Sequence, residues 1–475
     1  MKIYYLTATE LLERYRKKQL SPVEVTRAVL DRIAAFQDRL NAFCLVDEET
    51  SLTAARESEA RWMKDKPKGL LDGVPVSIKD LVLTRGWPTL FGSKTTDPSQ
   101  PWIENAPCVA RLLEHGAILI GKTTTPEFGY SFITVSPLTG ITRNPWDITK
   151  SPGGSSGGAA VAVSMGMGPL AIGTDGGGSI RIPSSWTGVY GLKSTFGRVP
   201  HYPRGVYGSL SHAGPITRTV EDAARMMTVI TGADPRDWYA LPPNGCDYCV
   251  GLNDGVKGLK VAYSPNLGLG KKIIGPWGEL DYTVHQDVND LISKAAAVFS
   301  DLGASVEQVD SLDLEEALKI HSTLWSVFSA RKVRTLTPEQ RSVLDPGFAE
   351  MAMRGEKVSL MDFAEALAGL EVLGVKMKLF HEKYDLVLSP TFPVVASDAA
   401  ILPKKLNGPS PFTCPFNGTK QPAASIYCGL TPEGLPVGLQ IVGPLYKDDL
   451  VLRASRAYES ARGDFPVPPL AKSKL

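Results

Sequence analysis

Two serines set among glycines lie 24 residues apart, and each has the surroundings of a nucleophile. Ser155 lies within Ser151-Pro-Gly-Gly-Ser-Ser-Gly-Gly158, and Ser179 follows directly after three glycines. A serine hydroxyl becomes a nucleophile when a neighbouring group takes its proton, and the resulting oxyanion needs backbone N–H donors. Glycine has no side chain to block a substrate carbonyl from these donors. The two segments therefore indicate acyl-transfer chemistry.

The glycines Gly176, Gly177 and Gly178 predict an oxyanion hole beside Ser179, the residue placed to attack the carbonyl carbon. A run of glycine and serine around Ser155 is also typical of a flexible linker. Here apolar segments with helical and strand patterns flank both glycine loops closely, which favours a site inside a folded core.

The base that would activate the serine is not assigned to a histidine, because no histidine lies in a recognisable motif. The pattern favours surface or packing roles for all six, which are His115, His201, His212, His285, His321 and His381. Lys79 is the alternative, since burial can lower a lysine pKa from about 10.4 far enough to leave the amine neutral. Serine–lysine pairs are an established substitute for serine–histidine pairs. A salt bridge from Lys79 to Asp80 is the competing interpretation.

The elements that must position these groups alternate between strand and helix. Residues 74–79 alternate apolar and polar, which predicts a half-buried strand with Lys79 at its carboxyl end. Residues 117–120 predict a short buried strand. Residues 159–163 predict a helix after the first glycine loop, and residues 170–173 a strand leading into the second. This alternation predicts an α/β layered fold.

Further elements extend along the chain. Two capping boxes, Thr7 with Glu10 and Ser21 with Glu24, predict helix starts near the N-terminus. The segment 233–258 is rich in proline, glycine and asparagine, which is typical of a linker. Strand and helix patterns resume after it. Residues from about 310 to 380 are mostly amphipathic helix by pattern.

The composition excludes several classes of partner. Lysine and arginine number 51 against 50 acidic residues in a chain of 475, so the net charge is +1. No excess of positive charge favours nucleic acid or an anionic membrane. The N-terminus lacks the apolar core of a signal peptide, and no run of about 18 apolar residues occurs. We therefore expect a cytoplasmic protein with no nucleic-acid and no membrane partner.

The cysteines predict no disulfide framework. Six of them in a chain of this length follow no framework spacing, which favours a reducing compartment. Cys246-Asp-Tyr-Cys249 is a lone CxxC, and a zinc site needs further ligands. A structural or loop role is the favoured interpretation, and no metal or other cofactor is predicted.

Taken together, Lys79, Ser155 and Ser179 with their glycines resemble the amidase signature family of serine hydrolases. Other segments resemble the blocks of that family too: 71–80, 121–129, 142–146, 191–193 with 196–198, 214–218 and 434–444, with Gln421-Pro422. The resemblance covers nearly the whole chain and is weakest between about 233 and 415. It implies one amidase signature domain over 1–475, with a signature core at about 71–220. The fold it implies is a single large α/β/α layered fold with a long mixed twisted sheet flanked by helices. The variable helical region at about 310–380 could form a lid.

The resemblance also implies roles for individual residues. Ser179 would be the acylated nucleophile, Ser155 a bridging proton relay held by a cis peptide, and Lys79 the general base that later acts as an acid. The N–H groups of the three glycines and of Ser179 would line the oxyanion hole. Four residues would hold these loops in place, with an ion pair between the last two: Ser156, Thr174, Asp175 and Arg181.

Two positions depart from the family pattern, and they leave the substrate pocket open. Thr124 stands where asparagine is usual, and Gly176 where threonine or a branched residue is common. Aromatic residues near the signature blocks could form an apolar pocket wall or pack in the core: Phe128, Tyr130, Phe132 and Trp146. Trp325 and Phe328 of the helical region could likewise touch substrate or merely pack.

The expected activity is hydrolysis of the C–N bond of a small acyl or aryl amide through an acyl-enzyme on Ser179. A carbamate or ester hydrolase of the same family is one alternative. The glutaminase component of a tRNA-dependent amidotransferase is another, against which Ile182 follows Arg181 where those proteins usually carry glutamine. The expected partner is a small amide or related acyl substrate, and the expected assembly is a monomer or homodimer.

Overall fold

The computed structural model describes residues 2–275, 278–401 and 408–472. Its centre is an 11-stranded mixed sheet in the order β1-β3-β2-β6-β8-β7-β14-β15-β13-β9-β12. The strands are β1 (Phe43–Val46), β2 (Pro75–Lys79), β3 (Ile118–Thr123), β4 (Val135–Ser136), β5 (Gly140–Ile141), β6 (Leu170–Asp175), β7 (Tyr190–Lys193), β8 (His212–Thr217), β9 (Lys260–Tyr263), β10 (Lys272–Gly275), β11 (Gly278–Asp281), β12 (Ser305–Gln308), β13 (Leu386–Pro390), β14 (Ala423–Leu430) and β15 (Pro436–Val442).

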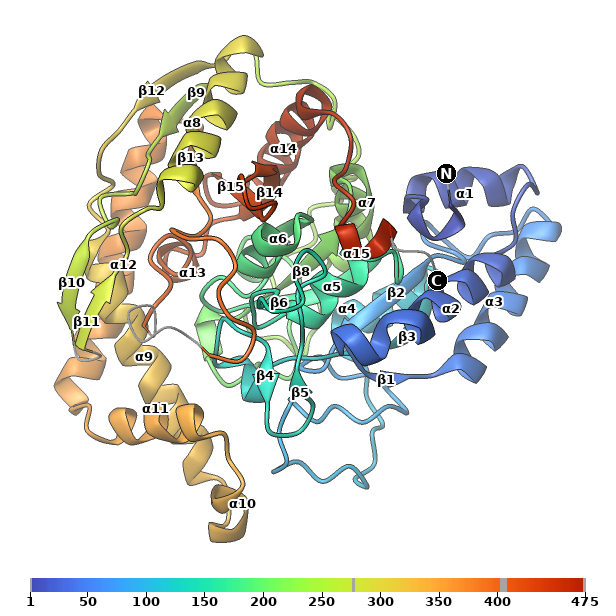
Figure 1. Cartoon of the computed structure of the whole chain (residues 1–475), viewed down its shortest axis with the longest axis horizontal. Helices are drawn as coiled ribbons and strands as arrows, with labels where there is room; N and C mark the ends of the chain where they lie inside the picture. Colours follow the sequence, from blue (N-terminus) through green and yellow to red (C-terminus); the bar gives the residue numbers. More distant parts are fainter. Residues whose placement is uncertain (1, 276–277, 402–407, 473–475) are drawn as a thin grey trace.

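Helices flank this sheet, as the alternating pattern predicts (Figure 1). They are α1 (Ala8–Arg16), α2 (Pro22–Leu40), α3 (Glu48–Met63), α4 (Pro107–Glu114), α5 (Gly157–Ser164), α6 (Arg181–Thr187), α7 (Val220–Ile230), α8 (Gln286–Asp301), α9 (Glu315–Arg334), α10 (Pro338–Ser342), α11 (Pro346–Glu356), α12 (Leu360–Lys383), α13 (Pro415–Gly418), α14 (Asp448–Arg462) and α15 (Pro469–Lys472). Both predicted capping boxes are present, at the starts of α1 and α2.

The centre of the sheet is covered on both faces. Successive strand residues point to opposite faces. On β6, Leu170 and Ile172 join the large core cluster that includes α7, whereas Ala171 packs with α5 and with Ile180, which precedes α6. Strand β2 is therefore buried along its whole length, and the prediction of a half-buried strand was wrong. Its polar residues are buried as well because they face a second layer of helices rather than solvent.

Parallel pairing brings the two glycine loops together. Strands β2 and β6 are parallel neighbours, so their carboxyl ends lie at the same edge. Strand β2 ends at Lys79 and β6 ends at Asp175, just before the second glycine loop. The first glycine loop runs directly into α5, which packs on β6. Lys79 and the two glycine loops, which are distant from one another in sequence, thus meet at this edge.

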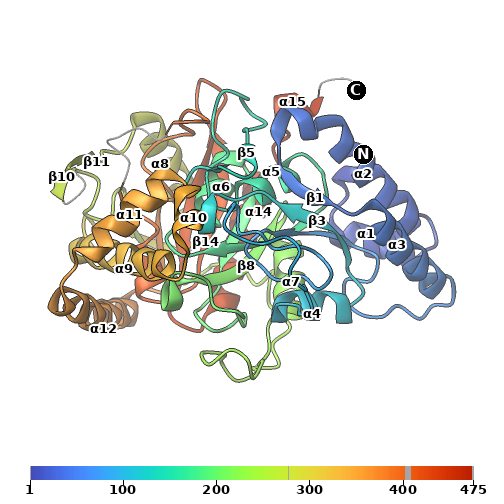
Figure 2. The same ribbon diagram turned by 90° about the horizontal axis from the view of Figure 1, so that it is seen from below.

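Helices α9, α11 and α12 form a helical region at the end of the molecule opposite α1–α3 (Figures 1 and 2). Helix α9 packs extensively on both α11 and α12, and the main sheet contributes little to this layer. The predicted helical content of 310–380 is confirmed. Residues 233–258 carry no helix or strand, but Tyr248, Leu252 and Val256 are buried in the main core, so the segment packs on the fold rather than linking separate cores. Among the described residues, no helix is both long and apolar enough to cross a membrane.

Candidate active site

The Lys79 side chain meets the first glycine loop at the edge where β2 and β6 end. Its Nζ lies 2.7 Å from Ser155 Oγ, 2.8 Å from Ser156 Oγ and 3.0 Å from Thr174 Oγ1. Lys79 is completely buried, and burial lowers its pKa well below the usual lysine value, with Asp175 offsetting part of the effect. A buried lysine surrounded by hydroxyls is therefore present as the neutral amine over much more of the pH range than a surface lysine.

The alternative of a Lys79–Asp80 salt bridge is wrong. The Asp80 carboxylate instead accepts hydrogen bonds from the backbone N–H groups of Leu90 and Gly92, each at 3.1 Å. Lys79 forms no ion pair with any residue that the structure describes. The reason is geometric, because adjacent residues at the end of a strand direct their side chains to opposite sides.

The hydrogen-bond pattern around Lys79 distinguishes the two adjacent serines. Ser156 donates its hydroxyl proton to the Thr174 carbonyl at 3.1 Å, so its oxygen serves as an acceptor for the lysine N–H. The Ser155 hydroxyl has no partner other than Lys79 in the described part of the chain. A neutral Lys79 can therefore donate to Ser156 and Thr174 while accepting a proton from Ser155.

Ser179 adjoins the first glycine loop through the backbone. The Ser156 N–H donates to the Ser179 carbonyl at 3.1 Å, and the peptide between Gly154 and Ser155 is cis, as the family resemblance implies. The side chains of Ser155 and Ser179 both line the same cavity. Ser179 is 8% exposed, which leaves it accessible to a ligand within that cavity.

A buried ion pair holds the second glycine loop. Arg181 Nη2 lies 2.9 Å from Asp175 Oδ1, and both side chains are fully buried. Burial alone would raise the pKa of Asp175, but Arg181 and a hydrogen bond from Asn417 hold it well below its usual range. The guanidinium also donates to Gln440 at 2.8 Å and to the carbonyl of Thr413 at 3.0 Å. The loop is thereby tied to the C-terminal third of the chain.

The three glycines do not offer three equivalent donors. The Gly178 N–H donates to Asp175 Oδ1 at 2.7 Å, so the expectation that Gly178 contributes to the oxyanion hole needs correction. Its amide is occupied because the Asp175 carboxylate caps the turn that leads into α6. The N–H groups of Gly176, Gly177 and Ser179 have no hydrogen-bond partner among the described residues. These three remain available to a substrate oxygen.

Two side chains that sequence reasoning missed fix the orientation of these peptides. His321 of α9 bonds the Gly176 carbonyl through Nε2 at 3.0 Å, and Thr413 donates to the Gly177 carbonyl at 2.6 Å. Burial lowers the pKa of His321 to about 4, so the ring is neutral near pH 7. Because a carbonyl only accepts, Nε2 carries the proton. In a trans peptide the N–H points opposite the C=O, so His321 directs the Gly177 N–H away from the helix.

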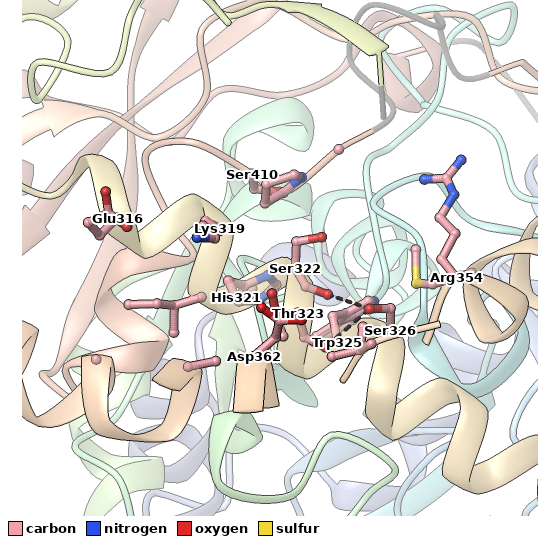
Figure 3. Close-up of a pocket in the computed structure, with 18 of the residues that line it drawn as sticks. Glu316, Lys319, His321, Ser322, Thr323, Trp325, Ser326, Arg354, Asp362 and Ser410 are labelled. Carbon is pink, nitrogen blue, oxygen red and sulfur yellow. Dashed lines mark hydrogen bonds between the residues drawn. The ribbon is translucent and has the colours of Figure 1, made fainter. Parts of the chain in front are cut away.

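Two cavities reach Ser179. The larger cavity, of about 730 Å³, is lined by Gly177, Ser179 and residues of α9, α11 and α12. Figure 3 shows the α9 side chains Lys319, His321, Ser322 and Trp325 around it, with Arg354 of α11 at one side. Charged residues of both signs line it, namely Glu316, Lys319, Arg354, Lys357, Asp362, Glu365 and Lys376.

The smaller cavity, of about 240 Å³, reaches Ser155 and Thr174 as well as Gly176 and Ser179. Its walls are largely aromatic and aliphatic, formed by Leu81, Phe91, Phe128, Val206, Tyr207 and Trp325. Trp325 lines both cavities and stacks on Tyr207 with 3.3 Å between the ring centroids. This aromatic pair therefore forms part of the wall where the two cavities adjoin.

The predicted pocket aromatics divide between these cavities with one exception. Phe128 lines the smaller cavity, and Tyr130 and Phe132 line the larger one. Trp146 lines neither, which corrects its assignment to the pocket. Its indole N–H donates to the Thr187 carbonyl at the end of α6, so the ring packs behind the site.

The two departures from the family pattern have different consequences. A side chain at Gly176 would place its Cβ 2.9 Å from the Trp325 ring, so the glycine accommodates the close approach of α9. Thr124 hydrogen-bonds the Thr142 hydroxyl at 2.7 Å and lines neither cavity. The departure at Thr124 therefore does not alter the lining of either cavity, whereas the departure at Gly176 does.

Metal-binding side chains do not gather in the part of the chain that the structure describes, where no group of three or more His, Cys, Asp or Glu residues could hold an ion. Cys246 and Cys249 are free and half-buried. Both flank Tyr248, which is buried in the main core. The site described above is therefore built from serine, lysine and backbone groups.

Comparisons with known proteins agree with this architecture. Residues 24–452 match the sequence profile of the Amidase family. The chain is 35% identical to an acylamidase of Rhodococcus erythropolis, over 97% of this chain and 96% of the relative. It is 36% identical to a glutamyl-tRNA(Gln) amidotransferase subunit of Acidothermus cellulolyticus, over 96% and 94%. The crystal structure of a bacterial aryl acylamidase of the amidase signature family superimposes with a TM-score of 0.87 at 31% identity, covering 97% and 96% of the two chains. The chain thus belongs to the amidase family and is a hydrolase of carbon–nitrogen bonds other than peptide bonds.

Proposed function

We propose that this amidase cleaves small acylamides, with Ser179 as nucleophile, Ser155 as proton relay and Lys79 as base. The observation that carries this proposal is the buried Lys79 amine, which has no acidic partner among the described residues and lies 2.7 Å from the Ser155 hydroxyl. A base of this kind accepts a proton through Ser155 when Ser179 attacks. The acylamidase relatives support an amide as the substrate.

The proposed reaction is a two-step acyl transfer. Ser179 Oγ attacks the carbonyl carbon, and its proton passes through Ser155 to Lys79. The N–H groups of Gly176, Gly177 and Ser179 stabilise the oxyanion. Protonated Lys79 then returns the proton through Ser155 to the leaving nitrogen, and the C–N bond breaks. Water enters, is deprotonated by the same route, and hydrolyses the ester on Ser179.

The two halves of the substrate occupy different cavities in this proposal. The smaller cavity contains Ser155, which must reach the leaving nitrogen to protonate it. The amine half therefore binds in the smaller cavity. The larger cavity reaches Ser179 and Gly177 but not Ser155, and it receives the acyl half.

A substrate panel tests this function. We expect the purified chain, with no other protein added, to hydrolyse aryl acylamides and simple aliphatic amides and to accept matched esters. Comparing kcat/KM for an amide, an ester and a carbamate that share one acyl group identifies the preferred bond. Glutaminase activity that appears only with an added partner protein, together with inactivity on every amide of the panel, would contradict the proposal.

The pH dependence of activity follows from the lowered pKa of Lys79. The amine must be neutral to act as a base, so kcat/KM should rise as pH increases through the pKa of Lys79 and be lost as pH falls through it. Because burial lowers this pKa well below the usual value, the rise should be complete well below about pH 10.4. The measurement is a pH–rate profile with an uncharged amide. A rise centred at the ordinary lysine pKa would argue against a neutral buried base.

Removing the His321 contact should slow catalysis without abolishing it. In a His321→Phe variant the Gly176–Gly177 peptide loses the bond that orients the Gly177 N–H. Loss of a whole oxyanion donor costs about 10²- to 10³-fold, and because this change only frees the donor we expect roughly a 10- to 100-fold fall in kcat. His321→Gln, which keeps an N–H donor, should recover most of the activity. Steady-state kinetics should show kcat and kcat/KM falling together. A change confined to KM would indicate that His321 contributes only to substrate binding.

A further inference from the structure

The smaller cavity carries positive charge without any carboxylate in its lining. Among the described residues, its charged lining residues are Arg204, Arg331 and Lys332, and no aspartate or glutamate lines it. The larger cavity, by contrast, is lined by both acidic and basic residues. Cations that border a largely apolar space favour an anionic ligand, because hydrogen bonds between charged groups are stronger than those between neutral groups.

One of the three cations is already neutralised. Arg204 forms an ion pair with Asp237, which is buried. Its guanidinium also stacks over the rings of Phe196 and Tyr239, at 4.8 and 5.0 Å from the centroids. Arg204 therefore has its interactions satisfied within the protein and does not need a ligand.

The other two cations, which are adjacent in sequence near the end of α9, have no carboxylate partner among the described residues. Arg331 donates a 3.4 Å hydrogen bond to the Val206 carbonyl, and Lys332 Nζ lies 4.9 Å from the centroid of the Phe128 ring. Over the three described ranges, neither residue forms an ion pair. Burial and the neighbouring Arg331 lower the pKa of Lys332. Both effects would be offset by an anion bound between the two side chains.

The carboxylate that acts electrostatically on Lys332 already accepts hydrogen bonds from other groups. Glu127 raises the pKa of Lys332 electrostatically but forms no ion pair with it. Its two oxygens accept hydrogen bonds from the Ser93 hydroxyl and the Asp345 N–H, each at 2.6 Å. Glu127 thereby anchors the start of α11 to the core and is not free to move toward Lys332.

We propose that the preferred substrate carries a carboxylate on its amine half, and that Arg331 and Lys332 bind this carboxylate. The inference rests on the proposed function, in which the amine half lies in the smaller cavity. The volume of about 240 Å³ and the rings of Phe91 and Phe128 fit an amine no larger than one aromatic ring with its carboxylate. Hydrolysis then joins the oxygen of water to the acyl carbon, breaks the C–N bond, and divides the hydrogens of water between the carboxylic acid and the amino acid released.

The test compares substrates that share one acyl group and differ only in the amine. The aromatic pair is 4-acetamidobenzoate and 4-nitroacetanilide, whose nitro group matches the carboxylate in shape and makes a better leaving group. The aliphatic pair is N-acetyl-4-aminobutyrate and N-propylacetamide. We expect the wild-type kcat/KM to favour the carboxylate of at least one pair by about tenfold, consistent with about 1.4 kcal/mol, and the responding pair identifies the amine as aromatic or aliphatic.

The variants Lys332→Met and Arg331→Met should each remove most of this preference, through a higher KM for the carboxylate substrate and little change for the neutral one. Arg334→Met is the matched control, since it removes one positive charge from the same helix at a residue that lines neither cavity. The control should retain the preference. Equal kcat/KM values for both members of each pair, or a preference unchanged in Lys332→Met, would overturn the proposal.

The outcomes separate this inference from the proposed function. Hydrolysis of the neutral amides without carboxylate preference overturns only the carboxylate site. Inactivity on all four substrates and on the wider amide panel overturns the function as well. Product inhibition gives a second readout, because 4-aminobenzoate should inhibit the wild type more strongly than aniline, and Lys332→Met should remove the difference.

Discussion

Replacement of Ser179 by alanine is expected to abolish hydrolysis of amides and esters alike, with kcat lowered roughly 10⁶-fold, as for loss of the nucleophile in a serine protease. In the proposed mechanism Ser179 supplies the oxygen that becomes acylated, so no later step can proceed without it. Its side chain is nearly buried and makes no hydrogen bond within the described ranges, so the alanine variant should fold. Steady-state kinetics on one amide and one ester of the same acid measure the effect.

A buried serine outside the site provides the control. Ser164 of α5 donates to the Thr187 carbonyl at 3.0 Å and lines neither cavity. Ser164→Ala should cost about 1 kcal/mol of stability and leave kcat near the wild-type value. A fluorophosphonate probe should label the wild type and Ser164→Ala but not Ser179→Ala. Labelling of Ser155 in the Ser179→Ala variant would assign the nucleophile to the other glycine loop.

Replacement of Lys79 by alanine should damage amide hydrolysis more than ester hydrolysis. General acid–base catalysis contributes about 10²- to 10⁴-fold, and we expect a loss of this size for the amide. An amine leaves only after protonation, whereas an alkoxide leaves more easily, so the ester should lose less. The measurement is the ratio of kcat/KM for a matched amide and ester in the wild type and in Lys79→Ala. Equal losses for the two substrates would argue against Lys79 as the proton donor.

A second buried lysine provides a control that distinguishes a loss of catalysis from a loss of structure. Lys122 on β3 is also fully buried and donates to Thr89 at 2.8 Å, away from both cavities. Lys122→Met removes an equivalent buried amine and should not change the amide-to-ester ratio. If Lys122→Met altered this ratio as Lys79→Ala does, the effect would reflect a general loss of structure.

The chemical groups of the site were largely predictable because they lie in short segments with strong local patterns. The strand ending at Lys79 and the helix after Ser155 are marked by apolar residues within a few positions. Parallel pairing then brings the ends of β2 and β6 together. The burial of β2 on both faces was not predictable, because a short alternating run does not reveal that helices cover its polar face as well.

The sequence alone determined the family resemblance, the α/β layers and the serine, lysine and glycine groups near the centre of the sheet, since these depend on local order and on motif spacing. Only the tertiary structure decided how the peptides of the second glycine loop are oriented, because two of the side chains that fix them are distant in sequence. His321 reaches Gly176 across 145 positions, and Thr413 reaches Gly177 across 236. The division into two cavities likewise arises from the packing of α9 over the loops. The same packing places Arg331 and Lys332 at the smaller cavity. Such contacts correspond to no motif in the sequence, because they depend on where a helix packs in the fold and not on the residues next to it in the chain.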